Sequence, residues 1–443
     1  MRLEFIEGTS KKFWEAKLDG TALHVKWGRI GTDGQSKTHQ FDSAKEAREE
    51  HDALVQEKTK KGYVRTDAPK EPPREPNLEA AMFEGLLRGD AAPALVYADW
   101  LQSHGNAWGE LITVQHALEK KPKDKALQKR EAALLKPLPM PDAKLGTVTW
   151  KWGCIDSLHV FNEQDWMDES YDVMVMLRPI LDLPHCGGLR ELRTGVIRWD
   201  SNEEDVPATL KEAGQRPLGK YVRRLFLGDK PSDVDMDHHT IGDVRALSKL
   251  FPNLEALKLT SGAASWSGRT NFEFGPLKLP KLKSLIIETC GLSSVRAKQL
   301  TSSTLPQLEE LEVWCGSKDY GANAKAKDLL PILTGPIFPK VRKLGLRNNE
   351  FTDELIPALV KSKLAGQLEV LDLSMGTLGS EGIKVLVANA AKFSSLQRLD
   401  VSQSYVSKDD EKALRKAFSV PIDCSDQKTV DEDYPSRYVS VHE

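Results

Sequence analysis

The stretch that decides the fold reads LEVLDL at 368–373, and near copies of it recur along the chain. The shared pattern is L-x-x-L-x-L, with Ile or Val allowed at the apolar positions. The other copies are IDSLHV at 155–160, LRELRT at 189–194, VRRLFL at 222–227, LEALKL at 254–259, LKSLII at 282–287, LEELEV at 308–313, VRKLGL at 341–346 and LQRLDV at 396–401. Successive copies begin 26 to 34 residues apart, a period typical of a stacked repeat array.

Each hexapeptide predicts a short strand whose alternate apolar side chains face one side. One such strand cannot bury its apolar side alone, so neighbouring copies must stack into a parallel sheet. The ninth position calls for Asn or Cys to bond the turning backbone, and Cys290 and Asn349 occupy it. The stretches 351–364, 378–393 and 406–418 are amphipathic helices. We therefore expect an α/β solenoid over residues 145–420.

This pattern resembles the leucine-rich repeat, and the longer copies resemble its ribonuclease-inhibitor type. The resemblance implies a concave face formed by the residues that flank the buried strand positions. Those residues are Arg224, Phe226, Lys258, Glu288, Glu310, Glu312, Trp314, Lys343, Arg347, Asp372 and Arg398. A tryptophan beside acidic groups, with arginine on adjacent strands, fits a protein-binding surface. The alternative is a solvated face on which Trp314 packs against its neighbour.

Residues 1–64 predict a small antiparallel sheet with one helix. The stretches LEFIEG, KFWEAKLDG, ALHVKWGRIG and SKTHQFD are short strands divided by glycine-containing turns. Ser43 and Glu46 form a capping box that opens a helix over 43–60, and Gly62 ends it in a left-handed conformation. With the solenoid, this unit makes the chain an α+β multidomain protein.

Three further segments complete the organisation. Residues 65–76 hold four prolines among mixed charges and predict a linker. Residues 77–136 have helical periodicity and predict a compact helical module. Within it, LVYADWLQSHG and WGELITVQ resemble the short companion domain that precedes repeat arrays in some bacterial proteins. Residues 421–443 are expected to form a tail, or a cap over the last repeat.

The N-terminal unit carries Trp27-Gly28-Arg29, with Ile30-Gly31, Gly34-Gln35, Phe41, Lys58-Thr59 and Gly62-Tyr63 after it. This run looks like a WGR domain, which occurs in DNA-damage-responsive poly(ADP-ribose) polymerases and in bacterial proteins grouped with a molybdate-metabolism regulator. The resemblance implies a domain that sits at a DNA end. It implies that Trp27 stacks near a sugar or base, that Arg29 serves phosphate or interdomain contacts, and that Gln35 shapes the turn.

Two observations keep other interpretations of this unit open. Trp27 is in phase with Leu23 and Val25, so it either packs at the edge of the sheet or contacts a ligand. Arg29 either forms an internal ion pair or contacts an external phosphate or partner. Residues 1–64 hold 12 basic and 11 acidic side chains, a balance of +1, so any basic face must come from clustering of lysines. The candidates are Lys11, Lys12, Lys26, Lys37, Lys58, Lys60 and Lys61.

The remaining features exclude several classes of protein. The net charge is -3, the five cysteines are scattered, and no apolar run reaches the ~18 residues of a membrane span. The N-terminus lacks the pattern of a signal peptide, so we expect a cytoplasmic bacterial protein. No C-x-x-C, G-x-S-x-G, H-E-x-x-H or phosphate-binding lysine motif is present, so we expect no metal, no cofactor and no enzyme activity.

We therefore expect a scaffold or regulator whose repeats bind a protein partner. Its WGR-like unit is expected to bind nucleic acid or a second protein. The alternatives are a regulatory protein that binds DNA ends or nicks through that unit, and an enzyme whose site the sequence does not reveal.

Overall fold

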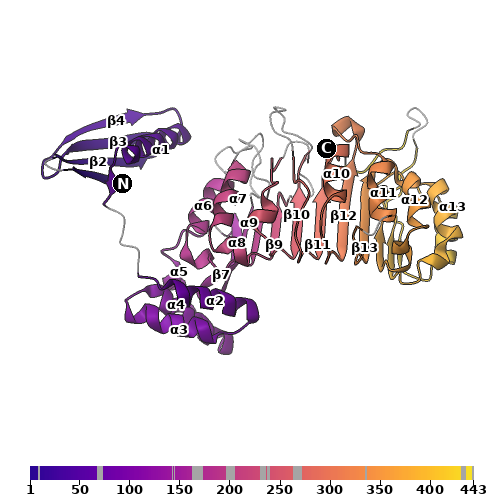
Figure 1. Ribbon diagram of the computed structural model, residues 1–443, viewed down its shortest axis with the longest axis horizontal. Helices are drawn as coiled ribbons and strands as arrows, with labels where there is room; N and C mark the ends of the chain where they lie inside the picture. Colours follow the sequence, from indigo (N-terminus) through magenta and orange to yellow (C-terminus); the bar gives the residue numbers. More distant parts are fainter. Residues whose placement is uncertain are drawn as a thin grey trace. The chain divides into compact units, whose positions relative to one another are not determined.

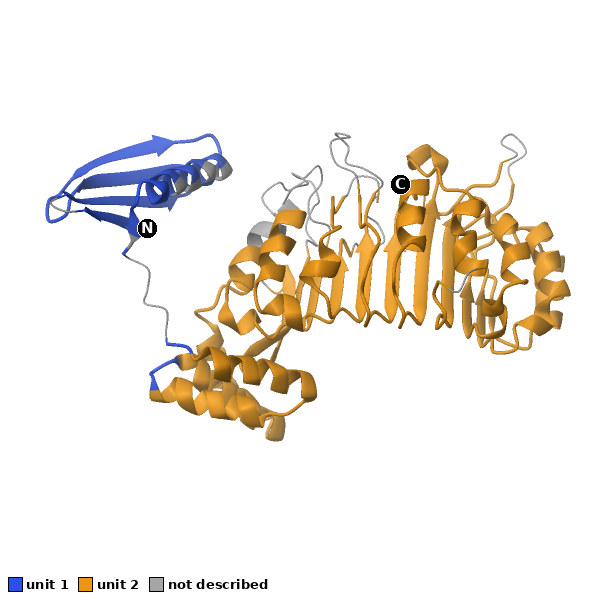
Figure 2. Cartoon of the chain, in the orientation of Figure 1, with its two compact units in different colours: residues 1–74, 104–106 blue, residues 75–103, 107–443 orange. Residues whose placement is uncertain are grey.

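The computed structural model describes residues 1–7, 10–66, 73–141, 143, 145–161, 173–195, 205–229, 236, 240–262, 272–334, 337–430 and 436–441. The chain forms two compact units, shown in different colours in Figure 2. Unit 1 comprises 1–74 with 104–106, and unit 2 comprises 75–103 with 107–443. The centre of the expected linker, 67–72, lies outside the described residues.

Unit 1 is a five-stranded antiparallel sheet with one helix. Its elements are β1 (Arg2–Glu7), β2 (Ser10–Asp19), β3 (Ala22–Arg29), β4 (Gln35–Gln40), α1 (Ala44–Lys60) and β5 (Val64–Arg65), and the strand order is β4-β3-β2-β1-β5. The helix begins where expected, because the Ser43 side chain accepts a hydrogen bond from the amide of Glu46 at 3.2 Å. It is followed by Gly62 at φ +85°, as expected. The short strand β5 was not expected.

The core of unit 1 lies between the sheet and α1. Its buried members are Leu3, Trp14, Ala16, Leu23 and Val25, against which Leu54 and Val55 of α1 pack. Alternation along β2 and β3 places these side chains on one face of the sheet, which we call the helix face.

Unit 2 begins with four helices, α2 (Pro76–Arg88), α3 (Ala92–Ser103), α4 (Ala107–Lys120) and α5 (Lys125–Leu135). They share a core with the start of the repeat array, which contributes Trp152 and Cys154. Gly153 donates its amide to Gln115 Oε1 and accepts from Trp108 Nε1, both at 2.7 Å. The expected separate module at 77–136 is therefore continuous with the array.

The array is an eleven-stranded sheet in which the strands follow one another in chain order (Figure 1). The strands are β6 (Gly146–Lys151), β7 (Cys154–Val160), β8 (Glu191–Thr194), β9 (Arg224–Leu227), β10 (Ala256–Thr260), β11 (Ser284–Glu288), β12 (Glu310–Gly316), β13 (Lys343–Asn349), β14 (Val370–Asp372), β15 (Arg398–Asp400) and β16 (Ile422–Asp423). All neighbours pair in parallel except β6, which forms an antiparallel hairpin with β7.

Helices connect the strands of the array and stack against one another in sequence. They are α6 (Val173–Leu181), α7 (Asp205–Gln215), α8 (Leu218–Tyr221), α9 (Leu247–Leu250), α10 (Ser294–Thr301), α11 (Ala326–Thr334), α12 (Thr352–Leu359), α13 (Ser380–Ala388) and α14 (Lys408–Ala417), with 3-10 turns at Pro184–Cys186, Lys318–Tyr320, Lys363–Gly366 and Ala390–Lys392. None of the helices in the described ranges is both long and apolar enough to cross a membrane.

One face of the parallel sheet is covered and the other is open. In β14, Leu371 is buried while Val370 and Asp372 are half-buried, and β9, β10 and β11 alternate in the same way. From β8 to β15 each strand starts two residues after the first residue of its hexapeptide, because that first apolar residue, such as Leu368, packs in the core just before the strand. At the ninth position Asn349 bonds the turn as expected, accepting the amide of Phe351 at 2.8 Å.

Candidate functional site

The first candidate surface lies at one end of the unit 1 sheet, where residues of both faces contribute to its lining. Pairing between β2 and β3 sets Lys12 opposite Arg29 and Trp14 opposite Trp27, and pairing between β3 and β4 sets Trp27 opposite Gln35. Side chains directly opposite each other in a sheet share a face. Trp27, Arg29, Gln35 and Lys12 therefore come together.

Trp27, Arg29 and Lys12 border a cleft of about 640 Å³. We call it the strand-end cleft. Its lining consists of Ser10, Lys11, Lys12, Phe13, Trp27, Gly28, Arg29 and Tyr63. Three of these residues are basic and none is acidic, and of the three aromatic residues Trp27 is exposed while Phe13 is buried, so the cleft suits an anion that carries a ring.

Trp27 is exposed although it shares the helix face with the core. Its exposed fraction is 38%, against 3% for its partner Trp14. Trp27 is absent from the cluster that packs against α1, so its ring remains available for contact. The backbone next to Trp27 requires a glycine at position 34. It has φ +68°, and a Cβ there would lie 2.6 Å from the carbonyl oxygen of Trp27.

Arg29 is exposed and makes no ion pair with any carboxylate of the described residues. The internal ion pair that the sequence left open is therefore not found there. Arg2, on the other face of the sheet, contrasts with it. Its guanidinium bonds Glu4 at 2.9 Å and Glu15 at 2.6 Å. Among the described residues no carboxylate pairs with Lys11, Lys12 or Arg29, so these cations are placed to meet an external charge.

The remaining predicted residues divide between the two faces. Lys37 is opposite Val25, which puts it on the helix face, whereas Lys26 alternates with Val25 and Trp27 and faces the other way. Lys11, Lys12 and Tyr63 also line the cleft; the sequence indicates the two lysines only as candidates for a basic cluster, and Tyr63 only as part of the WGR-like run. The two lysines precede Phe13-Trp14, and only the register of β2 against β3 reveals that they adjoin Arg29.

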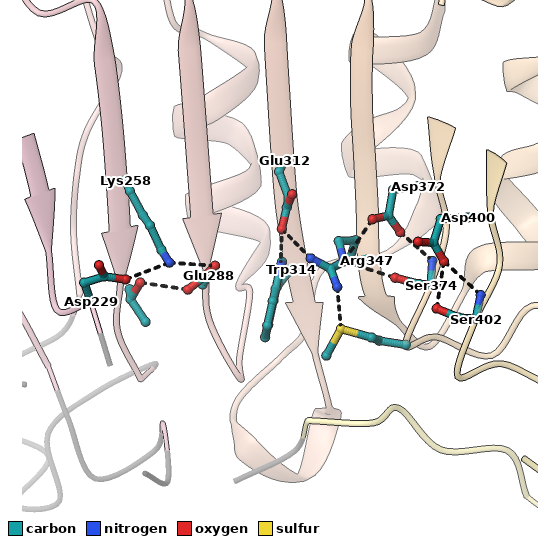
Figure 3. A network of polar contacts seen from close by, with 12 residues as sticks. Asp229, Lys258, Glu288, Glu312, Trp314, Arg347, Asp372, Ser374, Asp400 and Ser402 are labelled. Carbon is teal, nitrogen blue, oxygen red and sulfur yellow. Dashed lines mark hydrogen bonds and ion pairs between the residues drawn. The ribbon is translucent and has the colours of Figure 1, made fainter. Parts of the chain in front are cut away.

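The second candidate surface is the open face of the parallel sheet, where charged side chains of neighbouring strands meet (Figure 3). Lys258 bridges two carboxylates, with Asp229 at 3.0 Å and Glu288 at 3.1 Å. Thr260 donates to Glu288 at 2.9 Å. Burial alone would lower the pKa of Lys258, but attraction to Glu288 and Asp229 outweighs it and raises that pKa. Lys258 therefore stays charged.

Arg347 is the centre of a second group on this face, which we call the Trp314 cluster. It lies 2.9 Å from Glu312 and 3.3 Å from Asp372, and its guanidinium carbon is 5.1 Å from the centre of the Trp314 ring. The indole nitrogen of Trp314 donates to Glu312 at 2.7 Å (Figure 3). Burial raises the pKa of Asp372 even though Arg347 opposes the shift. The contacts with Arg347 and Glu312 leave the Trp314 side chain half-buried.

The other predicted residues of this face also have partners on adjacent positions. Arg224 pairs with Glu191, Lys343 with Glu310, and Arg398 with Asp400, while Phe226 lies beneath the guanidinium of Arg193 at 4.5 Å. Sequence reasoning missed Arg193 and Asp229 as members of the face. Arg193 sits in the irregular copy of the repeat, and Asp229 follows β9 beyond the hexapeptide.

Over the described residues, no group of three or more His, Cys, Asp or Glu side chains could hold a metal ion. Burial raises the pKa of Cys186 and of Cys315 to about 12, so both are thiols at neutral pH.

Comparison with known proteins agrees with the N-terminal geometry. Residues 1–70 match the model of the WGR domain. Two Escherichia coli (strain K12) proteins match there: YehF is 44% identical over 55 residues, 12% of this chain and 20% of YehF, and YfeS is 35% identical over 65 residues, 14% of this chain and 27% of YfeS. The match thus spans about a quarter or less of each relative.

A crystal structure of a Bacteroides fragilis protein resembles the whole chain. It covers 100% of this chain and 99% of its own, with a TM-score of 0.55 and 22% identity, and this likeness concerns the fold alone. The match to the family model shows that residues 1–70 form a WGR domain, and the two Escherichia coli proteins are its bacterial relatives.

Proposed function

We propose that this chain is a recognition protein whose WGR domain binds nucleic acid in the strand-end cleft. The observation that carries the proposal is the lining of that cleft, with three cations, the exposed indole ring of Trp27 and no carboxylate. Nucleic-acid binding needs cations for phosphates and exposed rings on which bases or sugars stack. Trp27 supplies such a ring, and Arg29, Lys11 and Lys12 supply the charges.

A DNA end or nick suits this cleft better than the side of a continuous duplex. The domain as a whole is nearly neutral, so its basic side chains serve a local contact rather than a long electrostatic track. A terminal or nicked nucleotide offers both an unstacked base and a phosphate that a small cleft can enclose. We therefore expect preference for an end carrying a 5′ phosphate.

Fluorescence anisotropy with labelled DNA tests the proposal. The panel holds a single strand, a blunt duplex and a nicked duplex, each with and without a 5′ phosphate. Trp27→Ala should weaken binding by about 1–3 kcal/mol, the typical value of one stacked base. His24→Ala is the matched control, since it removes an exposed ring from the opposite face of the same strand. Equal losses in both variants, or no binding at low salt, would assign the domain to a protein partner.

We further propose that the array, which is of the leucine-rich-repeat type, binds a protein on its open face. The Trp314 cluster favours this role because it combines an aromatic ring with an arginine, the residue types that dominate protein interfaces. Such a protein needs no catalytic group of its own, and we expect a non-enzymatic scaffold or regulator that acts in the cytoplasm.

Affinity capture from the native bacterium tests this second role. A specific partner should be retained by wild type and lost with Trp314→Ala. The control is Lys298→Ala on α10, which leaves the open face unchanged. A partner that both variants retain would show that the open face is not its binding site.

A further inference from the structure

Residues 436–441 lie across the turns that follow three consecutive strands of the array. At each of these places a residue other than glycine has a positive φ: Asn348 at +48° near the end of β13, and Met375 at +67° and Gln403 at +50° in the turns after β14 and β15. These residues are 27 or 28 positions apart, so they are equivalent in successive repeats. The backbone amide of each of the three donates to a backbone carbonyl in the turn of the next repeat, at 2.9–3.0 Å. These hydrogen bonds stack the turns into a row.

The row of turns binds the main chain of residues 436–441. The side-chain amide of Asn348 pairs with Val441 in both directions, accepting its N–H at 2.8 Å and donating to its carbonyl. The carbonyl of Met375 accepts the amide of Ser440 at 2.8 Å. Asn348 is fully buried, so its amide is held in place for this purpose.

Two further side chains bind the main chain at Tyr438. The hydroxyl of Tyr405 accepts its amide at 2.9 Å, and Lys428 donates to its carbonyl at 2.7 Å. Lys428 forms no ion pair among the described residues, and it lies 5.2 Å from the Tyr405 ring centre and 5.4 Å from that of Tyr438. Burial lowers the pKa of Lys428 to about 8, because the ammonium group is desolvated and its partner at Tyr438 is an uncharged carbonyl.

Specificity comes from three consecutive side chains of the segment. Arg437 bonds the carboxylate of Asp353 and the carbonyl of Thr377, both at 3.0 Å. Tyr438 meets the Tyr405 ring edge-on at 6.2 Å. The side chain of Val439 is buried, with an exposed fraction of 1%.

The segment is not needed to close the end of the array. That end is already formed by β16 and α14, whose Ile422 and Leu414 are buried in the repeat core. Of the described residues 436–441, only Val439 is buried, and Tyr438 is 53% exposed. Hydrogen bonds to main-chain atoms can be made equally well by any extended chain.

The segment also adjoins the Trp314 cluster. Met375, whose carbonyl holds Ser440, touches Arg347 through its sulfur, with Nη2 to Sδ at 3.0 Å. The turns that hold the segment therefore adjoin Arg347 of the Trp314 cluster.

We infer that the turns at 348, 375 and 403 form a groove for an extended peptide, which residues 436–441 occupy in cis as an exchangeable occupant. The partner segment has a basic, an aromatic and an aliphatic residue in the order of Arg437, Tyr438 and Val439. Because the cis segment is present at high effective concentration, a partner must displace it before it can bind. This inference stands on the groove and does not depend on nucleic-acid binding by the WGR domain.

The test uses a labelled peptide of sequence SRYVSV, with a C-terminal amide, and the full-length protein. Val439→Asp should eject the cis segment, because a carboxylate cannot enter the buried site, and should leave the groove intact. We expect this variant to bind the peptide at least about tenfold more tightly than wild type does. Asn348→Ala in the same background should abolish binding, and a peptide with Asp in place of its first valine should not bind.

Hydrogen exchange on wild type keeps the test decisive if Val439→Asp fails to fold. Excess peptide should speed exchange of the amides of 438–441 while leaving those of β13 unchanged. Equal peptide affinity in wild type and folded Val439→Asp, or no effect of peptide on exchange, would overturn the inference. A wild-type dimer that Val439→Asp disrupts would place the segment of a second copy in the groove, and would contradict a separate partner.

Discussion

Replacement of Arg347 by alanine should destabilise unit 2 in a pH-dependent way. Arg347 is one-quarter exposed and stands between Glu312 and Asp372, which are similarly covered. At an effective dielectric constant of about 20, unit charges at the 3.3 Å of the Asp372 pair attract by roughly 5 kcal/mol. Release of Arg347 from its own desolvation offsets part of this. We expect a net loss of about 2–4 kcal/mol near neutral pH.

The sign of the pH dependence follows from Asp372. Burial already raises its pKa in the folded protein, so its ionised form costs stability above that pKa and the cost disappears as the pH falls. Arg347 lowers this pKa, and its removal must raise the pKa further. The penalty of Arg347→Ala should therefore be largest near neutral pH and shrink as Asp372 becomes protonated.

Urea unfolding followed by circular dichroism, at about pH 7 and about pH 4.5, measures both effects. Arg342→Ala is the control, because Arg342 pairs with Glu369 at 2.7 Å but is 63% exposed. Such an exposed pair is worth at most about 1 kcal/mol. A loss from Arg347→Ala no larger than that of the control, or equal at both pH values, would refute the reasoning.

Three further predictions concern the architecture. Leu371→Ala should cost about 2–5 kcal/mol, because the side chain is buried between neighbouring strands; a loss below about 0.5 kcal/mol in urea melts would contradict the repeat register. Gly34→Ala should destabilise residues 1–66 by about 1–3 kcal/mol through strain at positive φ, seen as faster hydrogen exchange in β3, and unchanged exchange would argue against it. Limited proteolysis should cut first within the proline-rich 65–76, whereas first cuts inside 250–400 would contradict this layout.

The repeat array could be predicted because its information is local and repeated. Each hexapeptide specifies a strand, and the shared period makes every copy support the others, as at Leu311, Leu344 and Leu371. The union of the helical module with the array could not be predicted. It depends on contacts such as Trp108 with Gly153, 45 residues apart, for which the sequence has no periodic signal.

The candidate sites were predicted less completely than the fold. Trp27 and Arg29 were found through the resemblance of the N-terminal unit to a family. The exposure of Trp27 depends on how far along the sheet α1 packs, which the sequence does not indicate. On the open face, strand alternation identified Arg347 and Glu312 correctly as outward residues. The bond between Asn348 and the far end of the chain joins residues 93 apart, which no local pattern indicates.

The measurement that tests the central claim most directly is a salt titration of DNA binding by two variants, one at an arginine and one at a lysine. Arg29→Ala removes a cation of the strand-end cleft, and Lys26→Ala removes one from the opposite face of the same strand. We predict that Arg29→Ala weakens binding and reduces the slope of log affinity against log salt by about one, while Lys26→Ala leaves both unchanged. Equal effects of the two substitutions, or none from Arg29→Ala, would contradict the claim that the cleft binds nucleic acid.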